Sequence, residues 1–406
     1  MNQDLSATEA ARILGVSLAT LYSYVSRGLL TPGVAQAGRR KRYPRDEVLR
    51  LAARKADGKR GGHQVAAAMN WGTPVLETRI SRIAGGRLHY RGHDVLTLAA
   101  SATLEQAACL LWDDAGTDYF AADTAAATLA ANATNADPWR ASAVAGSAQP
   151  LSPLEAAMCA LPLHARTLPP QPDDAHGRFI TGAGLMRLLA SVLLKRAPSF
   201  QPLHLQIAQA WQADAAQAEW IRAALVLLAD HELNASTFTV RCVASTGASL
   251  AAALSAGLAA LSGAQHGGGS TLVLTMLETA LTSDNPERSI ATYFSGRDPS
   301  LAGYSHPLYP QGDPRAAYLL HAMSPWPQAR AVLVAGEQAA AHLGMRPNAD
   351  LALAAMSIVC DWPPAAGEIL FALARSAGWI AHAAEQIADG GLIRPRARYI
   401  GNYPAA

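Results

Sequence analysis

The C-terminal half of this sequence carries polar side chains suited to acid–base chemistry, set among otherwise apolar segments. Three are histidines: His231 in His-Glu-Leu-Asn, His266 before three glycines, and His306 in Gly-Tyr-Ser-His-Pro. Asp350 directly precedes an apolar segment, so helix packing would desolvate its carboxylate. Imidazole and carboxylate groups transfer protons in enzymes, and the glycines beside His266 would let a ligand approach backbone amides. These four residues are therefore candidates for proton transfer.

Three arginines, Arg315, Arg375 and Arg396, add cations to the C-terminal quarter. Taken singly, each candidate has a simpler explanation. A buried histidine is more often a hydrogen-bonded core group than a ligand. Arg375 could reach the surface or pair with an acid, Arg396 could belong to a tail, and the glycines after His266 could form only a tight turn. The combination, rather than any one residue, favours a site.

The segments that position these side chains are predicted to be helical. Half of the 406 residues are hydrophobic and only 16% are charged, which argues against disorder. Ala and Leu supply most of the apolar content and favour helix over sheet. A short β-hairpin is predicted where residues 78–83 and 87–91 flank Ala-Gly-Gly. The clearest helices are Leu151–Ala165, Leu185–Leu194, Ile221–Leu228, Leu250–Leu261, Ala316–Met323, Ala329–His342, Ala352–Val359 and Ile369–Ile387.

Several classes of protein are disfavoured by composition. Residues 242–277 contain no Asp, Glu, Lys or Arg, but their apolar run is shorter than the roughly 20 residues of a membrane span. We interpret Leu250–Leu261 as a buried helix at a domain core or subunit interface. The four cysteines lie far apart, which argues against a zinc site and a disulfide framework. The acidic start does not resemble a signal peptide, so we expect a cytoplasmic protein without membrane contact.

The first sixty residues are predicted to form a separate basic module. Ser6 and Glu9 form a capping box for a first helix, Gly15 makes a turn, and Ser17 caps a second helix that runs to about Ser26. A further helix is predicted from about Asp46 to Lys55. Residues 1–62 hold twelve Lys/Arg against five Asp/Glu, a balance of +7 in a chain whose net charge is +2. Only this module is therefore expected to meet a polyanion.

The stretches ATEAARILGVSLATLYSYVSRGLL and GRRKRYPRDEVLRL resemble the winged helix-turn-helix of the MerR and excisionase families. In that resemblance the second helix enters the DNA major groove, and a wing follows the phosphates. The resemblance implies a wing at Arg39, Arg40 and Arg42, and base-facing side chains at Thr20, Tyr22 and Ser23. Such modules also serve in docking or assembly, so DNA binding and docking both stay open.

The residues suited to chemistry lie in stretches that together resemble citrate synthase. These stretches follow one another in family order and cover nearly everything after the linker. They are RISRIAGGRLHYRGHDV, HELNASTFTVRCVAST, SGAQHGGGSTLVLTML, GYSHPLY, DPRA, PNADLALA, LFALARSAGWIAHAAEQ and LIRPRARYIG. The resemblance implies an all-α fold with large and small helical domains, preceded by a small winged helix-turn-helix domain. We expect that domain at 1–57, a linker at 58–73, and a catalytic region at 74–406 with its small domain at roughly 268–360.

The resemblance also implies a reaction, the condensation of an acyl-CoA with oxaloacetate to give citrate or 2-methylcitrate and free CoA. The α-hydrogen of a thioester is a very weak acid, so a base must act while a donor holds the enolate oxygen. By resemblance Asp350 is the base, His266 is that donor, His306 polarises the ketone, and His231 positions oxaloacetate. The carboxylates of oxaloacetate call for bidentate cations, a role that falls to Arg315, Arg375 and Arg396. The last would come from the partner subunit of a homodimer or larger oligomer. No metal or permanent cofactor is implied, because acyl-CoA is a co-substrate.

The sequence departs from the family pattern on the acyl-CoA side. Gly269 and Ser270 stand where the family usually has Ala-Asn, and Pro307 and Pro310 stand at two positions that are often basic. The second of these positions commonly faces CoA phosphates. A rival hypothesis follows, in which the chain is a DNA-binding regulator that senses oxaloacetate, citrate or CoA with little or no turnover. The two functions could also coexist.

Overall fold

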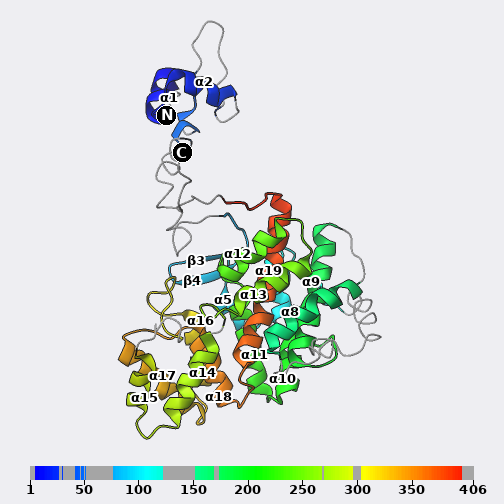
Figure 1. The fold of residues 1–406 in the computed structure, drawn as a ribbon, viewed down its shortest axis with the longest axis vertical. Helices are drawn as coiled ribbons and strands as arrows, with labels where there is room; N and C mark the ends of the chain where they lie inside the picture. Colours follow the sequence, from blue (N-terminus) through cyan, green and yellow to red (C-terminus); the bar gives the residue numbers. More distant parts are fainter. Residues whose placement is uncertain are drawn as a thin grey trace, which may run out of the picture. The chain divides into compact units, whose positions relative to one another are not determined.

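The computed structural model describes most of the chain, which separates into two compact units, 1–77 and 78–406 (Figure 1). The predicted linker and the predicted wing residues Arg39 and Arg40 lie outside the described residues. The described residues are 5–26, 30, 42–45, 47–49, 51, 76–121, 151–168, 173–267, 269–295 and 303–395.

The first unit has the predicted helix-turn-helix. Helix α1 (Ala7–Leu14) begins with the predicted capping box between Ser6 and Glu9 and ends at Gly15, whose φ of 61° is the left-handed conformation that glycine adopts readily. Helix α2 (Leu18–Ser26) follows, and Ser17 caps it by accepting a hydrogen bond from Thr20 N at 3.2 Å. Strand β1 (Leu5–Ser6) pairs antiparallel with β2 (Arg42–Tyr43).

The second unit opens with the predicted hairpin. Strands β3 (Ser81–Ala84), β4 (Arg87–Tyr90) and β5 (His93–Asp94) form one antiparallel sheet. Gly85 and Gly86 make the β3–β4 turn with φ values of 59° and 74°. Apart from one 3₁₀ turn (Ala165–Thr167), the other regular elements of the described part of this unit are α-helices. The predicted all-α fold is thus confirmed.

These helices fall into two groups that pack internally. The first group holds α5 (Val95–Ala99), α6 (Leu104–Leu111), α8 (Pro153–His164), α9 (Ala175–Leu194), α10 (Leu203–Trp211), α11 (Ala215–Leu228), α12 (Ala235–Ala244), α13 (Leu250–Leu261) and α19 (Ala366–Asp389). The second holds α14 (Gly269–Leu281), α15 (Pro286–Phe294), α16 (Pro314–Met323), α17 (Ala329–Leu343) and α18 (Ala349–Val359), drawn in yellow-green to orange in Figure 1. Helix α14 packs against α15, α17 and α18. The small domain expected at 268–360 stays a prediction.

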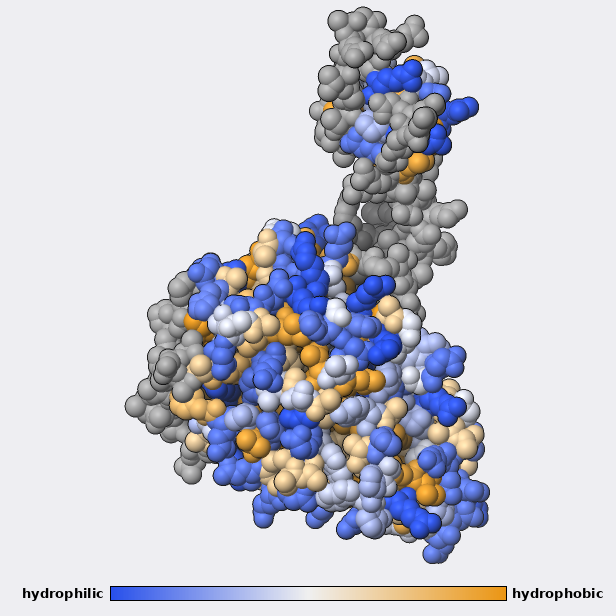
Figure 2. Space-filling view, turned by 180° about the vertical axis from the view of Figure 1, so that it is seen from behind, coloured by the Kyte–Doolittle hydropathy of each residue, from blue (hydrophilic) through white to orange (hydrophobic). Residues whose placement is uncertain are grey.

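Helix α19 organises the larger group. It packs against α6, α9, α11, α12 and α13, and 18 of its 24 residues are buried. Leu250–Leu261 forms α13 with the predicted bounds and packs against α8 and α12. Helix α9 is long and apolar enough to cross a membrane, but most of it is buried within the unit, as expected for a core helix. On the face drawn in Figure 2, hydrophilic residues surround smaller hydrophobic groups.

Two helices begin six or more residues before the predicted start. Helix α9 starts at Ala175, ten residues before the predicted Leu185, because Asp174 caps it by accepting a hydrogen bond from Gly177 N at 2.8 Å. Helix α11 starts at Ala215, again with an aspartate at the N-cap. The first turns of both helices lack the apolar periodicity used for the prediction. The N-cap aspartates therefore mark the helix starts better than the apolar pattern does.

Candidate active site

His231 lies in the turn that joins α11 to α12, and its side chain is buried. Asn234 ends this turn and caps α12 by accepting a hydrogen bond from Thr237 N at 3.0 Å. Nε2 of His231 hydrogen-bonds the hydroxyl of Tyr309 at 2.9 Å. This bond connects the larger helix group to the loop that carries His306.

The ring of His306 meets the ring of His231 edge to face, with centroids 5.0 Å apart. The loop that holds His306 is fastened to the start of α18, because Asn348 N donates to Gly303 O at 2.9 Å. Gly303 has a φ of 82°, and a Cβ there would lie 2.6 Å from the side chain of Val273 on α14. Backbone geometry therefore demands glycine at this position.

Arg315 opens α16 and forms a buried ion pair with Asp313, the residue that caps the same helix. Its Nε and Nη2 donate to the two Asp313 oxygens at 3.0 and 2.7 Å. Asp313 also accepts a hydrogen bond from Ala349 N at 3.2 Å, which joins α16 to α18. The guanidinium carbon lies 5.3 Å from the ring centroid of Tyr309. Arg315 is thus fixed beside the His231–His306 pair.

Arg375 projects from α19 and is almost completely buried. Its Nε donates to the backbone oxygen of Leu228 at 2.9 Å, and its guanidinium carbon lies 4.7 Å from the ring centroid of Phe371. Its Nη1 is buried and has no hydrogen-bond partner among the described residues. Burial lowers the pKa of Arg375 to about 10, so the side chain stays a cation at neutral pH. A buried cation with an unused donor calls for an anionic ligand.

Asp350 lies in the first turn of α18, where its backbone N–H donates to the Asn348 side chain at 3.0 Å. The residue is only partly buried, but Oδ1 is buried and has no hydrogen-bond partner in the described structure. Burial raises the pKa of Asp350 to about 7; Arg315 opposes this rise and Asp313 adds to it. A carboxylate with so high a pKa is a much stronger base than an ordinary aspartate.

His266 lies between α13 and α14, and its Nε2 contacts the hydroxyl of Ser236 at 2.8 Å. The same hydroxyl is within 3.0 Å of Asn234 Oδ1 and 3.3 Å of Trp379 Nε1. Because Nε2 is engaged by Ser236, Nδ1 is the nitrogen of His266 that remains for a ligand. The His266 ring also meets Phe371 edge to face at 5.9 Å between centroids.

All three histidines have a lowered pKa. Burial is the main cause in each case, and Arg375 acts in the same direction on all of them. The pKa falls to about 4 for His266 and His306, and well below the ordinary value for His231, on which Arg315 acts most strongly after burial. The imidazoles are therefore neutral at pH 7 and act as hydrogen-bond groups rather than as cations.

The structure brings most of the predicted residues together. His231, Arg315 and Arg375, which are buried, and His306, which is partly buried, form one group, joined by ring contacts and by the electrostatic influence of both arginines on the histidines. His266 adjoins this group through Phe371 and the field of Arg375. Asp350 adjoins it through Asp313 and Arg315. Arg396 lies outside the described residues.

The predicted nucleic-acid residues lie in the first unit. Tyr22 is exposed on α2, and Arg42 is exposed on β2. Thr20 is partly buried, and its hydroxyl lies 2.9 Å from that of Ser17, the residue that caps α2. The side chain of Ser23 lies outside the described residues, as do Arg39 and Arg40.

The sequence did not single out three side chains that hold the site together. Asp313 could have been found, because an aspartate before Pro314 is a strong N-cap signal and fixes a carboxylate beside Arg315. Tyr309 and Ser236 gave no comparable signal, since their roles depend on contacts with residues 78 and 30 positions away. Within the described part of the chain no cluster of His, Cys, Asp or Glu could hold a metal ion, and the four cysteines are free thiols.

Comparison with known families agrees with this geometry. Residues 68–396 match the family described as "Citrate synthase, C-terminal domain", and residues 5–56 match a helix-turn-helix domain. The chain belongs to the citrate synthase family.

Individual citrate synthases match over different lengths. The enzyme from Haloferax volcanii is 31% identical over 362 residues, which cover 81% of this chain and 94% of that protein. Citrate synthase 2 of Bacillus subtilis is 32% identical over 197 residues, covering 46% of this chain and 51% of its own. The chain thus spans only about half the length of several relatives that it matches, including 55% for proteins from Mycobacterium tuberculosis and Mycobacterium bovis.

The fold is shared with solved citrate synthases. The enzyme from Thermoplasma acidophilum, solved as a ternary complex with carboxymethyl coenzyme A and oxaloacetate, has a TM-score of 0.67 at 22% identity. The match covers 82% of this chain and 96% of that one. At this level of identity the likeness establishes the fold, and the chemistry depends on the residues described above.

The structure also shows where the residues that depart from the citrate synthase pattern lie. Ser270 is buried in the first turn of α14, where Gly367 of α19 leaves it room; a Cβ on Gly367 would lie 2.9 Å from the Ser270 hydroxyl. Pro307 and Pro310 are exposed in the loop that carries His306. The departures from the family pattern thus lie at one packed position and in one exposed loop.

Proposed function

We propose that this chain catalyses the condensation of an acyl-CoA with oxaloacetate, giving citrate or 2-methylcitrate and free CoA. One observation carries the proposal. A buried guanidinium with a donor that no described residue uses, three imidazoles of lowered pKa and a carboxylate of raised pKa lie on neighbouring elements of the two helix groups and interact with Arg315 or Arg375. A small dicarboxylate with a ketone suits the guanidinium and the imidazoles. A thioester with an α-hydrogen suits the carboxylate of raised pKa.

Asp350 is proposed as the base that removes the α-proton of the acyl group. Its pKa of about 7 supports this role, because a base is most effective when its pKa lies near the working pH. The electron pair of the broken C–H bond moves toward the thioester oxygen, which needs a donor at that moment. We assign that donor to Nδ1–H of His266.

This assignment has a condition on Ser236. A neutral His266 that donates through Nδ1 must accept at Nε2, so the hydroxyl of Ser236 must donate to Nε2. The same hydroxyl also lies within hydrogen-bond distance of Asn234. Ser236 has one proton, and the proposed chemistry requires that it point to His266 when acyl-CoA is bound.

His306 is proposed to polarise the ketone of oxaloacetate. Its Nδ1 accepts a hydrogen bond from Leu308 N at 3.2 Å, so the proton of the neutral ring lies on Nε2. Nε2–H can donate to the ketone oxygen, which gains negative charge as the acyl α-carbon forms its bond to the ketone carbon and then takes a proton. Water subsequently cleaves the thioester and releases the CoA thiol.

The arginines are proposed to bind the carboxylates of oxaloacetate. Arg375 has an unused Nη1, whereas Asp313 already occupies two donors of Arg315. A third cation, Arg396, is proposed to come from the partner subunit of a homodimer. We also propose that the region 268–360 closes on the rest of the catalytic unit when oxaloacetate binds and excludes water.

A thiol-release assay with acetyl-, propionyl- and longer acyl-CoAs, with and without oxaloacetate, tests the proposal. Free thiol should form only when oxaloacetate is present. Acetyl and propionyl differ by one methylene, worth roughly 1–3 kcal/mol of discrimination, so their relative rates would identify the preferred product. Absence of turnover with every acyl-CoA would overturn the proposal.

A second candidate function is DNA binding by the first unit, supported by its match to a helix-turn-helix domain and by the +7 balance of residues 1–62. Salt-dependent binding to duplex DNA, weakened when Arg39, Arg40 and Arg42 are replaced by glutamine, would support it. If no binding to duplex DNA is detected even at low salt, the first unit would instead serve in docking or assembly.

A further inference from the structure

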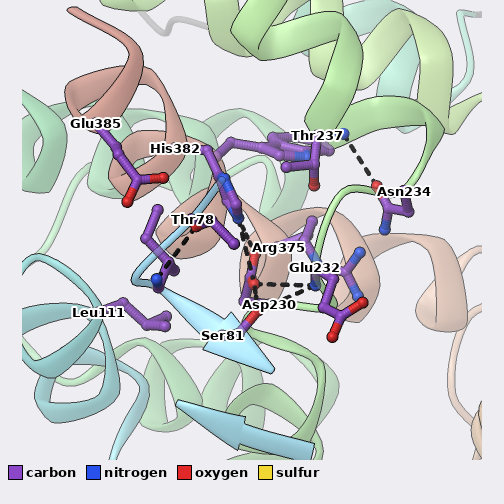
Figure 3. A network of polar contacts seen from close by, with 12 residues as sticks. Thr78, Ser81, Leu111, Asp230, Glu232, Asn234, Thr237, Arg375, His382 and Glu385 are labelled. Atoms are coloured by element: carbon purple, nitrogen blue, oxygen red, sulfur yellow. Dashed lines mark hydrogen bonds and ion pairs between the residues drawn. The ribbon is translucent and has the colours of Figure 1, made fainter. Parts of the chain in front are cut away.

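A buried carboxylate that the proposed chemistry does not use lies next to His231. Asp230 is fully buried, and its Oδ2 accepts hydrogen bonds from the Ser81 hydroxyl, from Glu232 N at 3.2 Å and from His382 Nε2 at 3.4 Å (Figure 3). The donors come from β3, from the His231 turn itself and from α19. Three parts of the chain are therefore tied to one carboxylate.

The backbone around Asp230 is shaped for this arrangement. Glu232 has a φ of 51°, which brings its N–H to the carboxylate two residues earlier. Gly378 of α19 passes directly beside Asp230: a Cβ on Gly378 would lie 2.3 Å from Asp230 Oδ1 and 2.6 Å from Ala229 O. Only glycine allows α19 to approach this closely, so the position of the carboxylate is set by the helix packing.

The contacts of His382 indicate its proton position. His382 is fully buried; its Nε2 faces Asp230 at 3.3–3.4 Å, and its Nδ1 has no hydrogen-bond partner among the described residues. Nε2 of His382 is therefore the ring nitrogen that donates to Asp230, and the lowered pKa of Asp230 keeps this carboxylate ionised.

Asp230 also acts on Arg375. After burial, the carboxylate of Asp230 is the main influence on Arg375, and it favours the charged guanidinium. Asp230 does this without taking a hydrogen bond from Arg375, whose Nε is bound to Leu228 O and whose Nη1 stays unused. Arg375, Gly378 and His382 are spaced so that they share one face of α19. One carboxylate thus contacts the His231 turn and the helix that carries Arg375.

We propose that Asp230 and His382 are positioning residues, which hold His231 and Arg375 at the distance and orientation that a dicarboxylate substrate requires. The inference rests on the proposed function, because it takes oxaloacetate as the ligand of Arg375. Asp230 offsets the guanidinium charge, and His382 fixes the direction of Asp230. Neither touches the substrate.

The test compares His382→Leu with His382→Gln in the full-length protein, measuring oxaloacetate affinity by calorimetry and the KM values for both substrates. Leucine has a comparable size, but it leaves the buried carboxylate of Asp230 without its donor from α19, so this variant should also be less stable than wild type. Affinity for oxaloacetate should fall about tenfold or more, as expected when a binding group is misplaced, while the KM for acyl-CoA stays within about twofold. Glutamine retains a donor and should keep most of the affinity.

Two further variants address the carboxylate itself. Asp230→Asn removes the charge, and Gly378→Ala displaces the carboxylate without changing any charge; both should weaken oxaloacetate binding more than acyl-CoA binding. The matched control is Arg222→Met, because Arg222 is a buried residue of α11 that binds carbonyl oxygens of Ala99, Ala100 and Ala102. This control should lower stability and leave oxaloacetate affinity unchanged.

The possible failures are distinguishable. A wild-type protein that binds oxaloacetate, together with folded His382→Leu and Asp230→Asn variants that bind it equally well, would refute the positioning role alone. An equal loss of affinity in Arg222→Met would refute it too, since any buried polar residue would then have the same effect. A wild-type protein that neither binds oxaloacetate nor releases thiol would overturn the proposed function and this inference together.

Discussion

Replacing Asp350 by asparagine should abolish turnover and at the same time stabilise the folded protein at alkaline pH. The carboxylate is buried at Oδ1 and has no hydrogen-bond partner there among the described residues, and its pKa rises from an ordinary 3.8 to about 7. Above pH 7 the folded state must keep this group ionised in a poorly solvated place. Asparagine has nearly the same shape and no charge, so it removes that energetic cost.

The magnitude follows from the pKa. A rise of roughly three units corresponds to about 4 kcal/mol at about 1.4 kcal/mol per unit, and the partial exposure of Asp350 reduces this to about 1–2 kcal/mol. The sign follows from proton linkage. Between pH 4 and 7 the unfolded chain releases the proton while the folded state retains it, so wild-type stability falls as pH rises through this window and stays low above it.

Urea denaturation of both proteins at pH 5 and pH 8, monitored by circular dichroism, measures the effect. The stability advantage of Asp350→Asn over wild type should be larger at pH 8 than at pH 5, and thiol release should be lost at both. An advantage that does not grow with pH would refute the raised pKa. Surviving turnover would refute the assignment of Asp350 as the base.

Other perturbations have equally specific outcomes. In wild type, kcat/KM from thiol release should fall about tenfold between pH 8 and pH 6, because the active carboxylate of Asp350 is lost as pH drops through about 7; the histidines do not titrate there, since the pKa of His266 and His306 is about 4. Arg375→Lys should raise the KM for oxaloacetate about tenfold to a hundredfold, because the unused donor of a planar guanidinium is lost. Ser236→Ala should lower kcat about tenfold with unchanged oxaloacetate affinity, because Nε2 of His266 loses its partner. Pro310→Lys should lower the KM for acyl-CoA several-fold, about 1 kcal/mol for one restored phosphate contact, if the exposed loop faces CoA as in the family pattern.

Each of these has a contrary result. A pH profile that is flat from 6 to 8 would mean that no group of pKa near 7 takes part. Unchanged oxaloacetate kinetics in Arg375→Lys would remove Arg375 from the binding site. If Ser236→Ala changed oxaloacetate affinity rather than kcat, the assignment of His266 to the acyl group would be wrong. If the KM for acyl-CoA were unchanged in Pro310→Lys, CoA would not bind beside this loop.

Local structure and the identity of the chemical groups were determined by the sequence alone. The capping box at Ser6 and Glu9, the β-hairpin at Gly85 and Gly86, and helix α13 follow from propensities and patterns within a few residues. The long stretches that carry His231, His266, His306 and Asp350 predicted the family, because residue types and their order along the chain are properties of the sequence.

Only the tertiary structure decided how these groups behave. Whether Asp350 has an ordinary pKa or one near 7 depends on burial by neighbours that are distant in the chain. The partnership of Asp230 with His382 spans 152 positions and depends on Gly378 letting α19 approach. Helix periodicity specifies which face of a helix is buried, but not which distant group it meets. Electrostatic energies depend steeply on the distances between charged groups and on the exclusion of water. The protonation states of this site and its available hydrogen-bond donors are therefore set only when the helices pack.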